Sequence, residues 1–113
     1  MSMTNISKYD VVIAKFPFAS SLKYKARPAV VVSSSEYNIH SRNTLLILAI
    51  SSNIEDKLDF ELKLHEWKFS GLLKPSIFKS AIATIEKSTL LLKVGSLSEL
   101  DRKNLESMIN TIC

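Results

Sequence analysis

Residues 44–50 are the stretch that most restricts the folds open to this chain. They read TLLILAI and are apolar at nearly every position. Such a run is typical of a strand buried on both faces or of a short buried helix, and its length favours the strand. We therefore expect these residues to form a β-strand inside the core.

Four further segments have strand-like patterns. Residues 9–16 and 29–33 are rich in β-branched residues, and residues 77–85 alternate imperfectly between apolar and polar side chains. Residues 58–64 alternate cleanly, which predicts a half-buried strand with one solvated face. The apolar face of that strand is expected to consist of Leu58, Phe60, Leu62 and Leu64.

The segments between these strands are polar or interrupted by Gly and Pro. Loops are therefore predicted over residues 19–26, 34–43 and 67–76, and a short helical turn within residues 87–92. Because Arg27 precedes Pro28, it is pushed toward extended geometry and is expected where the first loop meets the second strand.

The C-terminal segment has the clearest helical pattern in the chain. Ser98 is an N-cap candidate, and Asp101 follows three residues later, where a carboxylate complements the free N–H groups of a first turn. Apolar residues then recur at helical spacing, at Leu105, Met108, Ile109 and Ile112. Five or more strands followed by one helix predict a mainly β (α+β) domain, and a small closed barrel fits this order.

Length, charge and cysteine content limit the class of protein. The 113 residues suit a single domain over residues 1–113, and the net charge of +4 favours anionic partners such as nucleic acid only weakly. Cys113 is the only cysteine, so no intrachain disulfide can form and a reducing compartment is expected. The polar opening residues and the shortness of the longest apolar run predict a soluble, cytoplasmic protein without a membrane span.

No catalytic or metal-binding motif stands out. The sequence contains no Gly-rich phosphate loop, nucleophile elbow or zinc-ligand spacing, so we expect neither a metal nor a cofactor. His40 and His65 lie in separate polar stretches and are expected to be solvated surface residues. Basic and hydroxyl residues near predicted strand ends can build an anion site, namely Arg27, Ser51, Ser52, Lys74 and Lys79. This pattern by itself does not distinguish binding from catalysis.

Five blocks of the sequence together resemble a known family. YDVVIAKFPF, KARPAVVVSSSEYN, LLILAISSN, SGLLKPS and KVGSLSELDRKNLESMI follow one another as the successive blocks of the MazF/PemK toxins of type II toxin–antitoxin systems do. The resemblance runs over nearly the whole chain. The Arg-Pro pair before a hydrophobic strand and the hydroxyl after the third strand carry most of it.

The resemblance implies a fold and an activity. It implies an SH3-like small β-barrel with a C-terminal helix, a homodimer, and a cognate antitoxin as partner. It also implies a metal-independent endoribonuclease that cuts single-stranded RNA to 2′,3′-cyclic phosphate and 5′-hydroxyl ends. The family's active-site Arg and Thr or Ser correspond to Arg27 and Ser51. Serine in place of the more usual threonine lacks the methyl group that restrains χ1.

The chain departs from the family pattern at two further places. Tyr9-Asp10 stands where many members have Gly-Asp, and Lys79-Ser80-Ala81 stands where some carry an Arg and an Asp. A lysine attracts phosphate as a point charge but lacks the planar fork of arginine, so Lys79 is assigned to RNA binding.

Single-stranded RNA is usually held by aromatic stacking beside a basic groove. The residues around the first loop that fit this role are Phe18, Lys23, Tyr24 and Lys25, with Ser52, Lys74 and Lys79 as further RNA-binding candidates. For Phe18 and Tyr24 the alternatives are a core position and an exposed loop tip. Trp67 and Phe69 are expected in packing or in a dimer contact.

Two other functions remain open from the sequence. One is a non-catalytic inhibitor of DNA gyrase like the CcdB toxins, whose fold is similar, but gyrase inhibition does not require the Arg27 and Ser51 pair. The other is a decayed toxin that only binds RNA or its antitoxin, which the missing late-strand Arg and Asp keep open.

Overall fold

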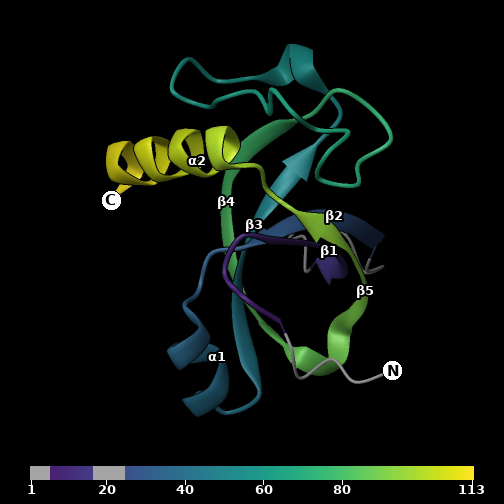
Figure 1. Cartoon of the computed structure of the whole chain (residues 1–113), viewed down its shortest axis with the longest axis vertical. Helices are drawn as coiled ribbons and strands as arrows, with labels where there is room; N and C mark the ends of the chain where they lie inside the picture. Colours follow the sequence, from purple (N-terminus) through teal and green to yellow (C-terminus); the bar gives the residue numbers. More distant parts are fainter. Residues whose placement is uncertain (1–5, 17–24) are drawn as a thin grey trace.

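A computed structural model describes residues 6–16 and 25–113. Its elements follow the chain as β1 (Asp10–Phe16), β2 (Lys25–Val31), α1 (Ser35–His40), β3 (Thr44–Ser51), the 3₁₀ turn η1 (Ile54–Asp56), β4 (Ile77–Glu86), the 3₁₀ turn η2 (Lys87–Thr89), β5 (Leu90–Ser96) and α2 (Glu99–Ile112). The strands form one antiparallel sheet in the order β4-β3-β2-β1-β5 (Figure 1). The expected mainly β fold with a terminal helix is confirmed.

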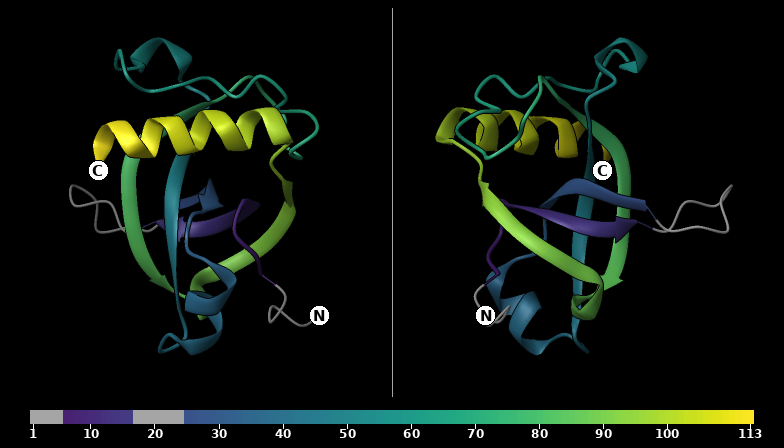
Figure 2. Two further views of the ribbon diagram at one scale, coloured as in Figure 1. Left: turned by 60° about the vertical axis from the view of Figure 1, so that its left-hand side comes forward. Right: turned by 90° about the vertical axis from the view of Figure 1, so that its right-hand side faces the viewer.

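The sheet is strongly coiled, so that β1 and β2 run across β3 and β4 (Figure 2). Within the described residues no ladder joins β4 to β5, so hydrogen bonding does not close the sheet into the full barrel that the strand count suggested. No helix in the same residues has the length and apolar character needed to cross a membrane.

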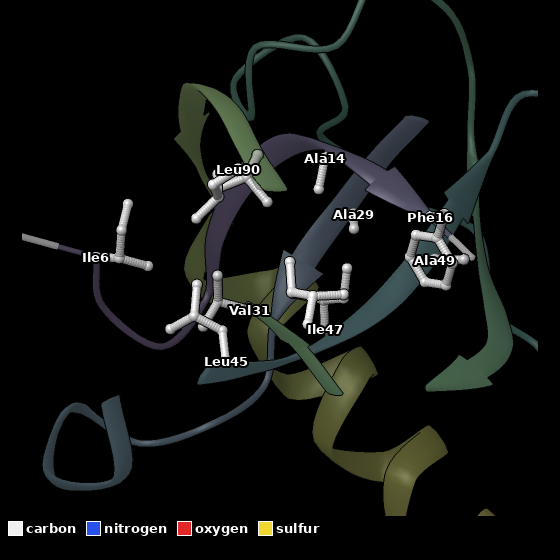
Figure 3. Close-up of a cluster of buried hydrophobic side chains, with 11 residues drawn as sticks. Ile6, Ala14, Phe16, Ala29, Val31, Leu45, Ile47, Ala49 and Leu90 are labelled. Carbon is white, nitrogen blue, oxygen red and sulfur yellow. The ribbon is translucent and has the colours of Figure 1, made fainter. Parts of the chain in front are cut away.

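Apolar side chains cover both faces of the sheet and form two cores. One core, which the curved sheet encloses, includes Val12, Ala29, Val31, Ile47 and Phe16 (Figure 3). The other lies between the sheet and α2 and consists of Val11, Val30, Leu48, Ile50, Leu64, Phe78, Leu97, Leu105 and Met108. Neighbouring residues of a strand thus enter opposite cores, which explains why residues 44–50 are apolar without alternation.

Helix α2 begins and docks largely as its pattern predicts. The Ser98 side chain accepts a hydrogen bond from the Asp101 N–H, and Leu105 and Met108 are fully buried. Ile109 is half-buried against the same core, whereas Ile112 is 38% exposed near the helix end and was wrongly expected on the buried face.

The strand predicted over residues 58–64 is wrong. Leu58 and Phe60 are 51% and 40% exposed, while Glu61, which follows Phe60, is 1% exposed, the reverse of the predicted faces. Only Leu62 and Leu64 pack on the core as predicted. The segment turns at residues 59–60 and makes only an isolated bridge from Lys63 to Ile77. The pattern misleads because the Glu61 carboxylate accepts hydrogen bonds from β4 and from its own turn, which stabilises a buried charge.

Two elements were missed. Helix α1 lies in a segment predicted to be a loop, and its N-cap Ser34 accepts a hydrogen bond from the Tyr37 N–H. Strand β5 begins inside the segment predicted to be a helical turn and takes its second half, while η2 takes the first half. Register shifts in its pairing with β1 break its alternation, so that both Leu91 and Leu92 are exposed.

The docking of α2 gives a first prediction. Leu105→Ala removes a fully buried side chain between helix and sheet, and we expect it to lower the free energy of unfolding by about 2–5 kcal/mol. Leu100→Ala changes the same residue type on the same helix at a position that is 48% exposed, and should cost less than about 1 kcal/mol. Urea unfolding followed by circular dichroism compares the two, and equal losses would show that α2 does not dock through Leu105.

Candidate functional site

A cavity of about 500 Å³ opens beside the ends of β2 and β3. Four of the sequence-predicted site residues line it together: Arg27, Ser51, Ser52 and Lys74. The remaining lining is mostly apolar and consists of Ile13, Pro28, Ile50, Gly71, Leu72, Leu73, Ser76, Leu92 and Val94. Cations and hydroxyls beside an apolar wall suit an anionic ligand that also carries a flat or apolar group.

Pro28 explains why the cavity lies here. The Val32 N–H donates to the Leu46 carbonyl of β3. Because N–H groups alternate in direction along an extended strand, the nitrogen at position 28 also faces β3, and proline has no hydrogen to donate there. The β2–β3 ladder accordingly ends at the pair Ala29 and Ala49.

Arg27 and Ser51 lie symmetrically beyond that last pair. Each is two residues past it on its own strand, and both line the cavity. The sequence placed Arg27 at a loop junction, but it lies within β2 and pairs with Ala14 of β1. The neighbouring strand therefore fixes the Arg27 backbone, while its side chain is exposed.

The hydroxyl of Ser51 is oriented by the chain that follows it. Its Oγ accepts a hydrogen bond of 3.1 Å from the N–H of Asn53, at the start of η1. Since an accepting hydroxyl keeps its own proton, Ser51 can still donate to a ligand oxygen.

The wall formed by residues 71–76 is held close to β5 by the two glycines of the chain. A Cβ at Gly95 would lie 2.5 Å from the Ser70 carbonyl oxygen, and a Cβ at Gly71 would lie 2.3 Å from the Val94 oxygen. Gly71 also has φ +90°, a conformation that other residues rarely adopt. Only glycine allows this close approach of the two backbones.

Asp101 holds the preceding turn against α2. Its buried carboxylate accepts hydrogen bonds from the N–H groups of His65 and Glu66, at 2.8 and 2.9 Å. Next to the cavity, the Ser76 hydroxyl donates to the Lys74 carbonyl at 2.9 Å. The backbone that carries Lys74 is thus fixed, and the sequence offered no pattern that singled out Ser76 or Asp101 for this purpose.

Lys79 does not line the cavity. Its ammonium group pairs with the carboxylate of Asp56 at 3.2 Å. Of the other predicted RNA-binding residues, Phe18, Lys23 and Tyr24 lie outside the described residues, and Lys25 is described only as the first residue of β2. His40 and His65 are exposed, as expected.

Glu61 shapes β4 where it passes the site. Three residues of β4, Lys79 to Ala81, lie opposite the single residue Ala49 of β3, which makes a bulge. The Glu61 carboxylate accepts from the Ser80 N–H at 2.7 Å, from its hydroxyl at 2.9 Å, and from the Leu58 N–H at 2.8 Å. Burial alone would raise the pKa of Glu61, but these hydrogen bonds and the charge of Lys79 outweigh it and lower the pKa.

A wider and more open hollow of about 680 Å³ follows α2 and includes Tyr9, Arg102 and Glu106. Tyr9, Arg102 and Glu106 are engaged in contacts with one another or with Lys8. The Tyr9 hydroxyl donates to Glu106, which also pairs with Lys8, while Arg102 lies 5.2 Å from the Tyr9 ring centre. Burial and the Glu106 carboxylate raise the pKa of Tyr9 to about 12. We therefore assign a structural role to this hollow.

Tyr9 and Asp10 stand where the resemblance noted in the sequence leads us to expect a Gly-Asp pair. Tyr9 has φ +75°, which glycine adopts without strain, and here the contacts of its side chain with α2 compensate for it. Asp10 is buried and pairs with Lys93 at 3.2 Å. The departure from Gly-Asp therefore affects the packing of β1 rather than the cavity.

Comparison with known proteins identifies the family. Residues 7–113 match the family described as PemK-like, MazF-like toxin of type II toxin–antitoxin system. The chain belongs to the MazF/PemK toxin family. No curated protein sequence matches it significantly.

Solved structures of MazF proteins share the fold. MazF from Deinococcus radiodurans superposes with a TM-score of 0.75 at 15% identity, covering 95% of this chain and 94% of that one. The Mycobacterium tuberculosis toxin MazF-mt6 gives a TM-score of 0.71 at 21% identity, with 91% and 95% covered. An endoribonuclease from a mycobacterial species, solved with its cognate antitoxin, gives 0.72 at 16% identity, with 96% and 93% covered.

The lowered pKa of Glu61 gives a second prediction for this MazF/PemK toxin. A carboxylate whose pKa is lower in the folded than in the unfolded state stabilises the fold above the unfolded value, and this stabilisation disappears as the pH falls. Glu61→Gln should therefore cost about 1–3 kcal/mol at neutral pH, and the difference from wild type should shrink below about pH 4.

Denaturant unfolding at several pH values measures this difference. Asp59→Asn, an exposed substitution in the same turn, serves as the control and should be nearly neutral throughout. A loss for Glu61→Gln that stays constant with pH would contradict a charged, hydrogen-bonded Glu61.

Proposed function

We propose that this MazF/PemK toxin is a metal-independent endoribonuclease that cuts single-stranded RNA. The products are a 2′,3′-cyclic phosphate and a 5′-hydroxyl. The observation that carries the proposal is the convergence of Arg27 and Ser51 on one cavity, at the position where the β2–β3 ladder ends. Gyrase inhibition gives no reason for this pair to share a pocket.

Arg27 is proposed to stabilise the transition state. The 2′-oxygen loses its proton and attacks the neighbouring phosphorus, the bond to the 5′-oxygen breaks, and that oxygen takes up a proton. Negative charge builds up on the non-bridging phosphate oxygens in the transition state. A guanidinium is charged at any working pH and carries donors in a rigid fork, which matches this developing charge. Because Arg27 is held by strand pairing with β1, little reorganisation is needed during the reaction.

Ser51 is proposed to orient the reacting phosphate or the 2′-hydroxyl. Its oxygen accepts from Asn53, which leaves its proton for a hydrogen bond to the substrate. The described lining of the cavity contains no histidine and no carboxylate, so a strong general base is missing from it. We therefore expect slow cleavage and no bell-shaped pH profile that depends on His40 or His65.

The remaining contacts are proposed to bind the RNA chain. Lys74 and Ser52 supply donors for phosphate inside the cavity, and its apolar wall can receive the face of a base. Phe18, Lys23, Tyr24 and Lys25 remain proposed RNA contacts on the basis of the sequence alone. Lys79 is a further proposed RNA contact outside the cavity.

The proposed setting follows the family. The toxin is proposed to act as a homodimer in the cytoplasm and to be inhibited by a cognate antitoxin. The antitoxin is supported by the fold neighbour from a mycobacterial species, which was solved in complex with its cognate antitoxin. An acidic, disordered antitoxin segment is the partner that the basic cavity favours.

Incubation of the purified protein with a long single-stranded RNA in excess EDTA tests the activity. Wild type should produce discrete cuts, mapped by primer extension. Arg27→Ala should slow cleavage by at least about 100-fold, and Arg27→Lys should restore it only in part, because an ammonium group lacks the bidentate fork.

Ser107→Ala, an exposed change on α2, is the matched control and should cut like wild type. Intact RNA with a folded wild-type protein would refute the ribonuclease and favour a decayed or gyrase-binding toxin. Cuts that persist in Arg27→Ala would remove Arg27 from the site.

A further inference from the structure

Lys79 is the cation closest along β4 to the proposed site, but two carboxylates already face it. The Asp56 carboxylate pairs with its ammonium group at 3.2 Å, and the charge of Lys79 also acts on buried Glu61. The side chain of Asp56 is 70% exposed and that of Lys79 is 29% exposed. The pair is therefore open to solvent on the Asp56 side.

The position of Lys79 is set independently of Asp56. The β4 bulge that carries it is fixed through its neighbour Ser80, whose N–H and hydroxyl both donate to the Glu61 carboxylate. Removal of the Asp56 charge would leave these bonds in place. Lys79 would then remain on the bulge with its charge only partly compensated, by Glu61.

Asp56 lies close to the site along the chain. It is the last residue of η1, five positions after Ser51, and the N–H of Asn53 at the start of that turn donates to the Ser51 hydroxyl. An RNA strand whose phosphate is held at Arg27 and Ser51 therefore passes near η1. The Asp56 carboxylate would repel such a strand, and it already occupies the ammonium group of Lys79.

We propose that Asp56 limits RNA affinity by holding Lys79 in an ion pair that an RNA phosphate must displace. The inference rests on the proposed RNA site and adds to it a residue that weakens binding. Exchange is feasible because ion pairs with an exposed partner are weak, and phosphate is a strong competitor for ammonium. Lys79 thus becomes a phosphate contact only once Asp56 has been displaced.

The test measures binding of the full-length protein to a 2′-O-methylated single-stranded RNA of mixed sequence by fluorescence anisotropy. This RNA cannot be cut, because its 2′-oxygen is blocked. Asp56→Asn should bind about two- to fivefold more tightly than wild type, and Lys79→Gln should bind more weakly by a similar factor. In the Lys79→Gln background, Asp56→Asn should lose most of its gain.

Glu55→Gln is the matched control, since it removes the same charge from the same turn, and no ion pair of Glu55 is found among the described residues. A gain for Glu55→Gln equal to that of Asp56→Asn would reduce the effect to general repulsion and overturn the proposal. Weaker binding by Asp56→Asn, or binding by no variant, would overturn it as well.

Cleavage of unmodified RNA by the same preparations separates the two proposals. Tighter binding by Asp56→Asn without cleavage by any variant would refute the ribonuclease and leave the role of Asp56 standing. Cleavage by wild type with no gain in affinity for Asp56→Asn would support the ribonuclease and refute the role of Asp56.

Discussion

The missing N–H of Pro28 determines where this sheet opens. Strands β2 and β3 pair through the core as far as Ala29 and Ala49, and the proline nitrogen then has nothing to donate toward β3. Beyond that point the two strands share a cavity instead of a ladder, with Arg27 and Ser51 on its walls. Strand β1 still pairs with residues 25–30 of β2. The backbone of Arg27 therefore stays hydrogen-bonded to β1 on one edge of β2, although β3 no longer pairs with the other edge.

The acidic residues that hold this architecture do not line the cavity. Asp101 binds backbone N–H groups of the turn at residues 65–66, Glu61 holds the β4 bulge, and Asp10 pairs with Lys93. All three are buried. The polar side chains in the described lining are therefore cations and hydroxyls only, which favours an anionic ligand although the net charge of the chain is only +4.

The sequence predicted the parts of this structure that depend on local patterns. The strands at residues 44–50 and 9–16 follow from their apolar and β-branched composition, and the helix after Ser98 follows from apolar periodicity and capping. Arg27, Ser51, Ser52 and Lys74 do line one cavity together. The strand predicted over residues 58–64 is wrong because periodicity cannot show that a glutamate will be buried by hydrogen bonds from a distant strand. Strand β5 was not predicted because its bulges depend on its pairing with β1. The Asp56–Lys79 ion pair was not predicted either, because it joins segments 23 positions apart.

A double-mutant cycle between Arg27→Ala and Ser51→Ala most directly tests whether the two side chains act on one phosphate. Single-turnover cleavage of the same RNA would be measured for wild type, both single variants and the double variant. The account predicts strong coupling, with a combined loss smaller than the product of the single losses by at least about fivefold. Losses that simply multiply would show that Arg27 and Ser51 act independently, and would contradict a shared catalytic site.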